Sequence, residues 1–328
     1  MARIYVYSPS GAVRDRAAFR RGVKRLQALG HEVEVDPCAL ASVQRFAGDD
    51  ATRLAAIGRA AASGADVALT SRGGYGLTRL LPALPYRDIG RAIERGTQFV
   101  GFSDFTAMQA ALLAKAGAVT WAGPALCEGF GAQDSADNIE GHGAAAPQSG
   151  ATLGPDEIML ACFDDLVTGA GEGTGWRLSP SAITALNGRT GLLARQATLW
   201  GGNLAVLVGL LGTPFWPDIK GGVLFLEDVG EHPYRIERML TQLLYAGVLG
   251  RQKAIVLGQF TEYTLTSHDK GFSMAKVVER LRSQLKTPIL TGLPFGHVPT
   301  KVLLPVGLQV DLLVEERDAL VLWGHRHH

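Results

Sequence analysis

A single serine, Ser103, occupies a position where proteins often present a nucleophile. The apolar run Gln98–Val100 predicts a short buried strand, Gly101 follows it, and a helical pattern starts at Phe105. Such a strand-to-helix turn exposes the hydroxyl, and the free N–H groups of the new helix favour developing negative charge. Phe105 stands where the G-x-S-x-G elbow has its last glycine, so the alternative that Ser103 or Asp104 simply caps the helix stays open.

A serine hydroxyl is a weak nucleophile and needs a base. Among the eight histidines, His297 is the strongest candidate because prolines and a glycine surround it in Leu293–Pro299. Such a loop is expected to be rigid and to orient the ring, although a purely structural loop histidine is the alternative. His232 stands at the start of a predicted helix, which favours a capping or exposed role.

An imidazole base usually needs an acid that fixes its tautomer and supports its cation. Glu227 ends a strongly apolar predicted strand, where a carboxylate is held rigidly and can point into a cleft. The alternatives are a helix-start acid or a partner of Arg235, and Asp228 competes for the same role. The chain order Ser103, Glu227, His297 is that of α/β-hydrolases, although triads arise in several orders.

A glycine-rich loop, Ser71–Gly76, follows the predicted strand Val67–Thr70. Such a turn can cradle phosphate, but it lacks both the G-x-G-x-x-G spacing and the Lys-Ser/Thr ending of nucleotide-binding loops. Its free N–H groups could instead supply half of an oxyanion hole. The N–H of Asp104, directly after the serine, would supply the other half.

Regular alternation of strands and helices in the first third predicts a mainly parallel sheet with helices on both faces. Ligands bind such sheets at the carboxyl ends of the strands. We therefore expect the glycine-rich loop and Ser103 to share one crevice. Residues 77–84 are expected to be helical, and 129–154, rich in small and polar residues, to form a long surface loop, flap or inter-domain approach.

The second half mixes apolar strands with amphipathic helices and ends in several expected β-segments from Val302 to Trp323. The predicted fold class is α/β, with an N-terminal Rossmann-like parallel sheet flanked by helices. A smaller β-rich α/β C-terminal domain is what the family resemblance given below implies. We expect residues 1–168 to form the nucleophile domain and 169–185 a linker. The C-terminal domain, 186–328, would carry the acid and the base.

Composition excludes several function classes for the chain of 328 residues. The formal net charge of +1 gives no basic field for nucleic acid. The three cysteines have no metal spacing and are too few and too scattered for a disulfide framework, which fits a reducing compartment. No apolar run reaches membrane-spanning length, and the N-terminus lacks a signal-peptide pattern. We expect a cytoplasmic protein without metal, cofactor, nucleic-acid or membrane partner.

Five motifs together resemble the LD-carboxypeptidases, serine peptidases of murein recycling whose relatives include the microcin C resistance proteins. The matching stretches occur in the family's order and span most of the chain: 71–76 (SRGGYG), 101–106 (GFSDFT), 201–204 (GGNL), 225–235 (FLEDVGE and PYR) and 292–297 (GLPFGH). Each motif alone is weak evidence, but five in order are specific.

The resemblance implies a catalytic triad of Ser103, Glu227 and His297, with backbone N–H groups of Gly74 and Asp104 as the oxyanion hole. It also implies a homodimer, and a murein tetrapeptide substrate cut between a diamino acid and the terminal D-alanine during peptidoglycan recycling.

An exopeptidase of this kind must also recognise a free carboxylate. We assign this to Arg72, whose guanidinium can bind a carboxylate bidentately, with an exposed or loop-bracing arginine as the alternative. Trp200 and Asn203 are further candidates for contact with substrate.

Two rival functions follow from the same residues. A resistance-type hydrolase of aminoacyl-nucleotide toxins would need an aromatic shelf for the base, and the regions of Trp176 and Trp200 could provide one. A non-catalytic, Rossmann-like small-molecule binding protein would need no paired serine and histidine.

Overall fold

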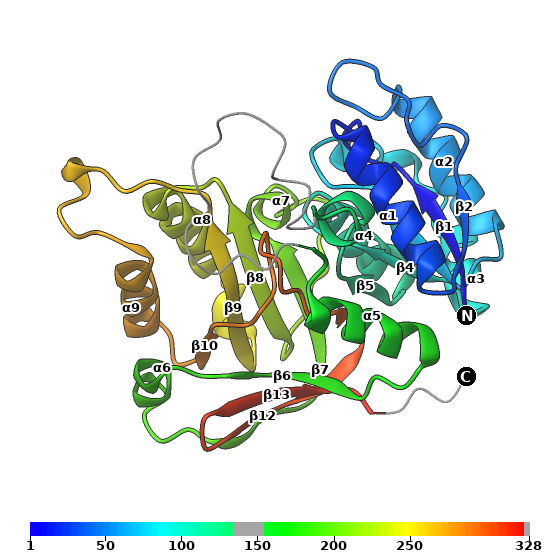
Figure 1. Cartoon of the computed structure of the whole chain (residues 1–328). Coiled ribbons are helices and arrows are strands. Elements are labelled where there is room, and N and C mark those ends of the chain that lie inside the picture. Colours follow the sequence, from blue (N-terminus) through cyan, green and yellow to red (C-terminus); the bar gives the residue numbers. More distant parts are fainter. Residues whose placement is uncertain (134–153, 325–328) are drawn as a thin grey trace.

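The protein is built around two β-sheets (Figure 1). The structure is a computed structural model and describes residues 1–133 and 154–324. The first sheet has the spatial order β11 (Leu304–Val306), β5 (Thr120–Ala122), β4 (Gln98–Gly101), β3 (Val67–Thr70), β1 (Arg3–Tyr7) and β2 (Glu32–Val35). All pairs are parallel except β11 with β5. The strand order changes direction between β1 and β3, which is where sheets of this kind bind ligands.

Side chains alternate across the first sheet and pack against helices on both faces. Tyr5 and Tyr7 of β1 join the core formed with α2 (Asp50–Ala62), α3 (Tyr86–Glu94) and α4 (Phe105–Ala116). Ile4 and Val6 point to the opposite face and pack with α1 (Arg16–Ala28) and α5 (Glu157–Thr168). A strand buried on both faces is apolar throughout, which explains the continuous apolar runs of the first third.

The second sheet is mixed. Its spatial order is β10 (Ile289–Thr291), β9 (Ala254–Thr261), β8 (Val223–Val229), β7 (Gly191–Asn203), β12 (Gln309–Glu315), β13 (Asp318–Leu322) and β6 (Gly173–Arg177). The pairs from β10 to β7 are parallel and the pairs from β7 to β6 are antiparallel. The accompanying helices are α6 (Pro180–Ala185), α7 (Leu204–Val208), α8 (Pro233–Tyr245) and α9 (Met274–Gln284).

The two sheets share a hydrophobic core and exchange a strand. Phe105 and Leu112 of α4 belong to the same buried cluster as Trp200, Leu204 and Leu226 from the second half. β11 leaves the C-terminal half of the chain to pair with β5 of the first sheet. The expected linker, residues 169–185, contributes β6 and α6, and β6 pairs with β13 at the edge of the second sheet. The two halves are therefore joined both by the shared hydrophobic core and by the pairing of β11 with β5.

The predicted α/β fold class is confirmed, as are the β-segments expected near the C-terminal end. Residues 77–84 form two short 3-10 turns, Leu77–Arg79 and Leu81–Ala83, instead of one helix. Pro82 lacks the N–H that a continuous helix would need there. Most of the expected loop 129–154 falls outside the described residues. Among the helices that the structure describes, none is both long and apolar enough to span a membrane.

Candidate active site

Ser103 lies in the tight turn between β4 and α4, and its φ of 63° places the backbone in the left-handed region. A side chain makes that conformation unfavourable by about 1–2 kcal/mol, and such strain is typical of serines presented on strand-to-helix turns. The side chain is partly exposed. Within residues 1–133 and 154–324, its hydroxyl forms no hydrogen bond.

The glycine-rich loop after β3 packs directly against this turn. A Cβ added to Gly73 would lie 2.8 Å from Ser103 Cβ and 2.9 Å from Ser103 Oγ. Only glycine therefore allows the loop to approach the serine so closely. Gly74 follows with a φ of 120°. Among the described residues, neither the Gly74 N–H nor the Asp104 N–H donates to the protein. The expectation that loop and serine share one crevice agrees with this contact.

The carboxylate of Asp104 ties the serine turn to the first sheet instead of capping α4. Asp104 takes the N-cap position without a side-chain bond to the helix. Its Oδ2 accepts hydrogen bonds from Ser10 Oγ and from the backbone N–H of Leu77, the latter at 3.0 Å. The side chain is 1% exposed, and this burial raises its pKa. The sequence suggested Asp104 as a helix cap or as a backbone N–H donor, and it gave no sign of this tether.

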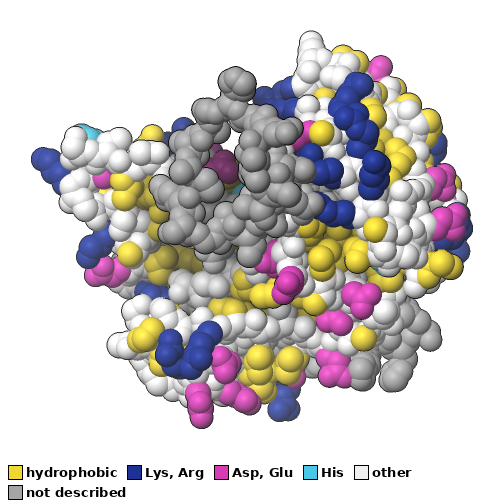
Figure 2. Space-filling view, viewed as in Figure 1, with side chains coloured by type: hydrophobic (Ala, Val, Ile, Leu, Met, Phe, Trp, Pro, Cys, Tyr) yellow, Lys and Arg dark blue, Asp and Glu magenta, His cyan; other side chains and the backbone are white. Residues whose placement is uncertain are grey.

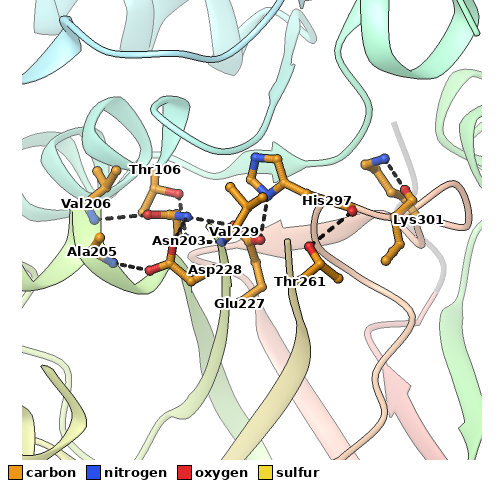
Figure 3. A network of polar contacts seen from close by, with 11 residues as sticks. Thr106, Asn203, Ala205, Val206, Glu227, Asp228, Val229, Thr261, His297 and Lys301 are labelled. Carbon is orange, nitrogen blue, oxygen red and sulfur yellow. Dashed lines mark hydrogen bonds and ion pairs between the residues drawn. The ribbon is translucent and has the colours of Figure 1, made fainter. Parts of the chain in front are cut away.

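Glu227 and His297 form a hydrogen-bonded pair beside the serine turn. Glu227 Oε2 lies 2.9 Å from His297 Nδ1, and the carboxylate is fully buried (Figure 3). The other ring nitrogen points away from Glu227, toward the ribbon of the first half. The His297 ring also packs on Phe102, the residue before Ser103, with ring centroids 4.9 Å apart. A carboxylate in this position fixes the tautomer of the imidazole and supports its cation.

Asn203 holds the Glu227 carboxylate from its other side. Asn203 Nδ2 donates to Glu227 Oε1 at 3.2 Å and to Asp228 Oδ1 at 3.0 Å, while its Oδ1 accepts from the Val206 N–H at 3.1 Å. Its backbone N–H donates to Thr106 Oγ1 on α4 at 3.0 Å, across the junction of the two halves. The side chain is thus a positioning group, with its polar atoms already bonded within the protein.

Asp228, the rival acid, has a different setting. It accepts hydrogen bonds from the backbone N–H groups of Ala205 and Val229, at 2.8 and 2.9 Å, and from Asn203. Burial raises its pKa to about 6, and the neighbouring charge of Glu227 adds to this shift. Its oxygens face α7 and its own strand end, and the carboxylate hydrogen-bonded to His297 is that of Glu227.

The loop that carries His297 crosses from one sheet to the other. It leaves β10 in the second sheet and ends at β11 in the first. Gly296 allows the crossing, since its φ is 134° and a Cβ there would lie 3.2 Å from Glu227 Oε2. The predicted rigid loop around His297 therefore spans the junction where the serine turn also lies.

An open cavity of about 400 Å³ lies beside the imidazole. His297 and Lys301 line it from the crossing loop, Glu128 from the segment after β5, and Glu262 from the end of β9.

On the face drawn in Figure 2, Lys and Arg side chains gather over α1, whose Arg21 donates to the Gly131 carbonyl. Among the described residues, no three His, Cys, Asp or Glu side chains are placed to hold a metal ion.

The three residues expected to contact substrate differ in placement. Arg72 donates to the Ala12 carbonyl at 3.0 Å and lies 3.7 Å from Glu128, so its guanidinium braces two loops. Trp200 is 1% exposed, and its Nε1 donates to Gln252 at 3.1 Å. This corrects the expectation for Trp200, because a tryptophan packed inside the core has no face for a ligand. Asn203 is 5% exposed and engaged as described above.

The structure also shows the contacts of Arg235, His232 and Trp176, for which the sequence suggested alternative roles. Arg235, proposed as a partner of Glu227, pairs with Glu231 instead. His232 caps α8 and lies 3.2 Å from Asp269, in line with its expected capping role. Trp176 is 7% exposed with its Nε1 bonded to the Thr291 carbonyl at 3.0 Å, so neither it nor Trp200 presents an aromatic shelf. His142, His325, His327 and His328 lie outside the described residues.

Comparison with known proteins identifies the family. Residues 4–123 match the LD-carboxypeptidase N-terminal domain, and residues 196–312 match the LD-carboxypeptidase C-terminal domain. The solved muramoyltetrapeptide carboxypeptidase of Oxalobacter formigenes is 34% identical, with a TM-score of 0.80 over 99% of this chain and 100% of that one.

Two curated relatives carry different names. The murein tetrapeptide carboxypeptidase of Pseudomonas aeruginosa is 29% identical over 69% of this chain and 65% of its own length. The microcin C7 self-immunity protein of Escherichia coli is 26% identical over 76% of this chain and 72% of its own. With matches over both halves of the chain and a relative 34% identical over its whole length, the protein belongs to the LD-carboxypeptidase family of serine-type hydrolases.

Proposed function

We propose that this enzyme releases the terminal D-alanine from murein tetrapeptide by hydrolysing the amide bond after the diamino acid, as part of peptidoglycan recycling. The observation that carries the proposal is the buried Glu227–His297 pair, whose ring packs on the residue before the strained Ser103. The names of the relatives from Oxalobacter formigenes and Pseudomonas aeruginosa support the choice of substrate.

The first half of the proposed reaction acylates the serine. His297 Nε2 takes the proton from Ser103 Oγ as the oxygen attacks the amide carbonyl carbon. Glu227 accepts a hydrogen bond from Nδ1 of the ring and stabilises the imidazolium. The oxyanion is bound by the N–H groups of Gly74 and Asp104, which are free of other partners among the described residues.

The second half regenerates the enzyme. The imidazolium gives its proton to the nitrogen of D-alanine as the amide C–N bond breaks, and the amino acid leaves. Water then loses a proton to His297 and attacks the ester carbonyl of the acyl-enzyme. Collapse of the second tetrahedral intermediate returns that proton to Ser103 Oγ and releases the shortened peptide.

A product assay tests the proposal. Wild type and Ser103→Ala would be incubated with murein tetrapeptide, with the tripeptide that ends in the diamino acid, and with an aminoacyl sulfamoyl adenosine. We expect D-alanine release from the tetrapeptide by wild type alone. Cleavage of only the adenosine compound would select the toxin-hydrolase alternative, and cleavage of neither would favour a binding protein.

A homodimer in the cytoplasm remains part of the proposal. The family resemblance supports the dimer, and the scarcity of cysteines supports a reducing compartment. Light scattering coupled to gel filtration would measure the mass of the particle in solution. A mass equal to that of one chain at micromolar concentration would rule the dimer out.

A further inference from the structure

One buried cation beside the imidazole has no role in the reaction described above. Lys301 lies four residues after His297 and lines the same 400 Å³ cavity. It is 3% exposed, which is rare for lysine because removing an ammonium group from water is costly unless an anion accompanies it. Lysines in that setting need a counter-charge or a strong acceptor.

Among the described residues, the partners of Lys301 supply an acceptor but no close counter-charge. Its Nζ donates to the carbonyl of Val298. It also lies 5.1 Å from the centre of the Phe102 ring. Figure 3 shows Lys301 near His297. Within residues 1–133 and 154–324, no carboxylate lies within 4.0 Å of this ammonium. Burial accordingly lowers the pKa of Lys301, and more distant acids offset the shift only in part. An ammonium group has three N–H donors, so two remain available to a ligand.

The nearby acids are already engaged elsewhere. Glu128 lies 3.7 Å from the Arg72 guanidinium. Asp156 accepts from Thr300 Oγ1 at 2.7 Å and from the Met159 N–H at 3.0 Å. An anion that enters the cavity would therefore meet in Lys301 a cation that no carboxylate of the described residues contacts directly.

Arg72 is a weaker candidate for the same task than the sequence suggested. Its guanidinium already has a carboxylate neighbour in Glu128 and a carbonyl acceptor in Ala12. Binding a substrate carboxylate there would place two carboxylates around one cation. Within the described part of the chain, Lys301 has no carboxylate in direct contact, and it lies on the loop that also carries the imidazole.

We propose that Lys301 binds a carboxylate of the peptide substrate in the cavity beside His297. The proposal rests on the proposed function, since it assumes that a peptide with free carboxylates enters this site. The ammonium and the imidazole both contact the Phe102 ring, at 5.1 Å from its centre and with ring centroids 4.9 Å apart, respectively. Lys301 would thus set the substrate in register with the nucleophile and act as a specificity residue.

Two carboxylates of a tetrapeptide have the required chemistry. One is the terminal carboxylate of D-alanine, and the other is the side-chain carboxylate of a third residue such as diaminopimelate. Three substrates separate them: the tetrapeptide with diaminopimelate, the same peptide ending in D-alaninamide, and a tetrapeptide with lysine as third residue. Steady-state kinetics would be measured with wild type, Lys301→Met and Lys301→Arg.

We expect Lys301→Met to lower kcat/KM for the full substrate by about tenfold to a hundredfold, the usual effect of losing a hydrogen bond to a charged group. The substrate that lacks the bound carboxylate should be cut equally well by wild type and variant. That substrate is the amide if the terminal carboxylate is bound, and the lysine peptide if the side-chain carboxylate is bound. Lys301→Arg, which keeps the charge, should recover part of the loss.

Lys253→Met is the matched control. Lys253 also donates its Nζ to a backbone carbonyl, that of Arg195 at 2.8 Å, but it is exposed and outside the cavity. This variant should cleave all three substrates as wild type does. Equal loss on all three substrates in Lys301→Met would overturn the proposal, since a structural role has no preference among them.

A binding measurement keeps this proposal separate from the proposed function. Titration calorimetry measures the Kd of the diaminopimelate tetrapeptide for Ser103→Ala and for Ser103→Ala/Lys301→Met. Neither measurement requires turnover. If wild type releases no D-alanine, the proposed function fails. A Kd at least tenfold weaker in the double variant would still support carboxylate binding by Lys301. Equal Kd values, or no binding by either protein, would refute it.

Discussion

Asn203 Nδ2 lies 3.2 Å from Glu227 Oε1 and holds the buried carboxylate on the side opposite the imidazole. The same amide reaches Asp228, and its oxygen caps α7. One side chain therefore fixes both an acid of the site and the start of a helix. Its two tasks can be separated by experiment.

Asn203→Ala is expected to lower kcat by about tenfold to a hundredfold, because Glu227 loses a hydrogen bond to its charged form. It should also lower the free energy of unfolding by about 1 kcal/mol through loss of the helix cap. Ser179→Ala is the control, since Ser179 caps α6 through the Ala182 N–H at 3.1 Å. Equal stability losses with unchanged kcat in both variants would contradict a positioning role for Asn203.

Ser103→Gly and Ser103→Ala should both abolish hydrolysis but differ in stability. Glycine adopts a φ of 63° without the steric cost that alanine keeps. We expect Ser103→Gly to be more stable than Ser103→Ala by about 1 kcal/mol, measured by urea unfolding. Equal stabilities would mean that the turn stores no strain.

Gly73→Ala should reduce kcat without unfolding the protein. The new Cβ would lie 2.8 Å from Ser103 Cβ, so the serine or the loop must move away. A misplacement of a reacting group by about 1 Å can cost about a hundredfold in rate. Gly90→Ala in α3 is the control, because its Cβ meets nothing within 4 Å and should leave kcat unchanged. Wild-type kcat in Gly73→Ala would show that the serine tolerates displacement.

Asp228 should make stability depend on pH in an unusual direction for an acid. Its pKa in the folded protein is about 6, above the ordinary value of 3.8. Between these values the folded state holds a proton that the unfolded chain has released. The contribution of this group to stability is thus fully present below about pH 4 and lost as pH rises through 6.

Urea unfolding of wild type and Asp228→Asn from pH 4 to 7 measures this effect. The free energy of unfolding of wild type should fall by about 2 kcal/mol relative to the variant over that range, because part of the effect of the shifted pKa lies below pH 4. The neutral variant loses a hydrogen-bond acceptor at every pH, so only the slopes are compared. Parallel curves would mean that the Asp228 carboxyl titrates normally.

Local sequence patterns predicted the elements of the site well. The turn at Ser103 follows from an apolar strand, a glycine and a new helical period, and these are all local signals. The position of Glu227 at a buried strand end follows from the apolar run before it. The hydrogen bond between Glu227 and His297 joins residues 70 positions apart, and no local pattern encodes such a contact.

The errors came from side-chain direction and from non-local partners. Trp200 was a candidate for contact with substrate, but it stands on β7 with its side chain buried in the core. Lys301 stands before an apolar run, and no local sequence pattern marks it as a site residue. Its burial depends on the path of the crossing loop, which only the strand exchange between the sheets determines.

The crossing loop also bears on how the enzyme becomes active during its synthesis. Ser103 emerges from the ribosome early, whereas His297 and the strand β11 that anchors its loop emerge nearly two hundred residues later. The first sheet lacks its β11 edge until that strand arrives, and the imidazole is absent until then. If Ser103 and His297 act as proposed, hydrolysis would therefore begin only after the crossing loop has been synthesised and β11 has paired with β5.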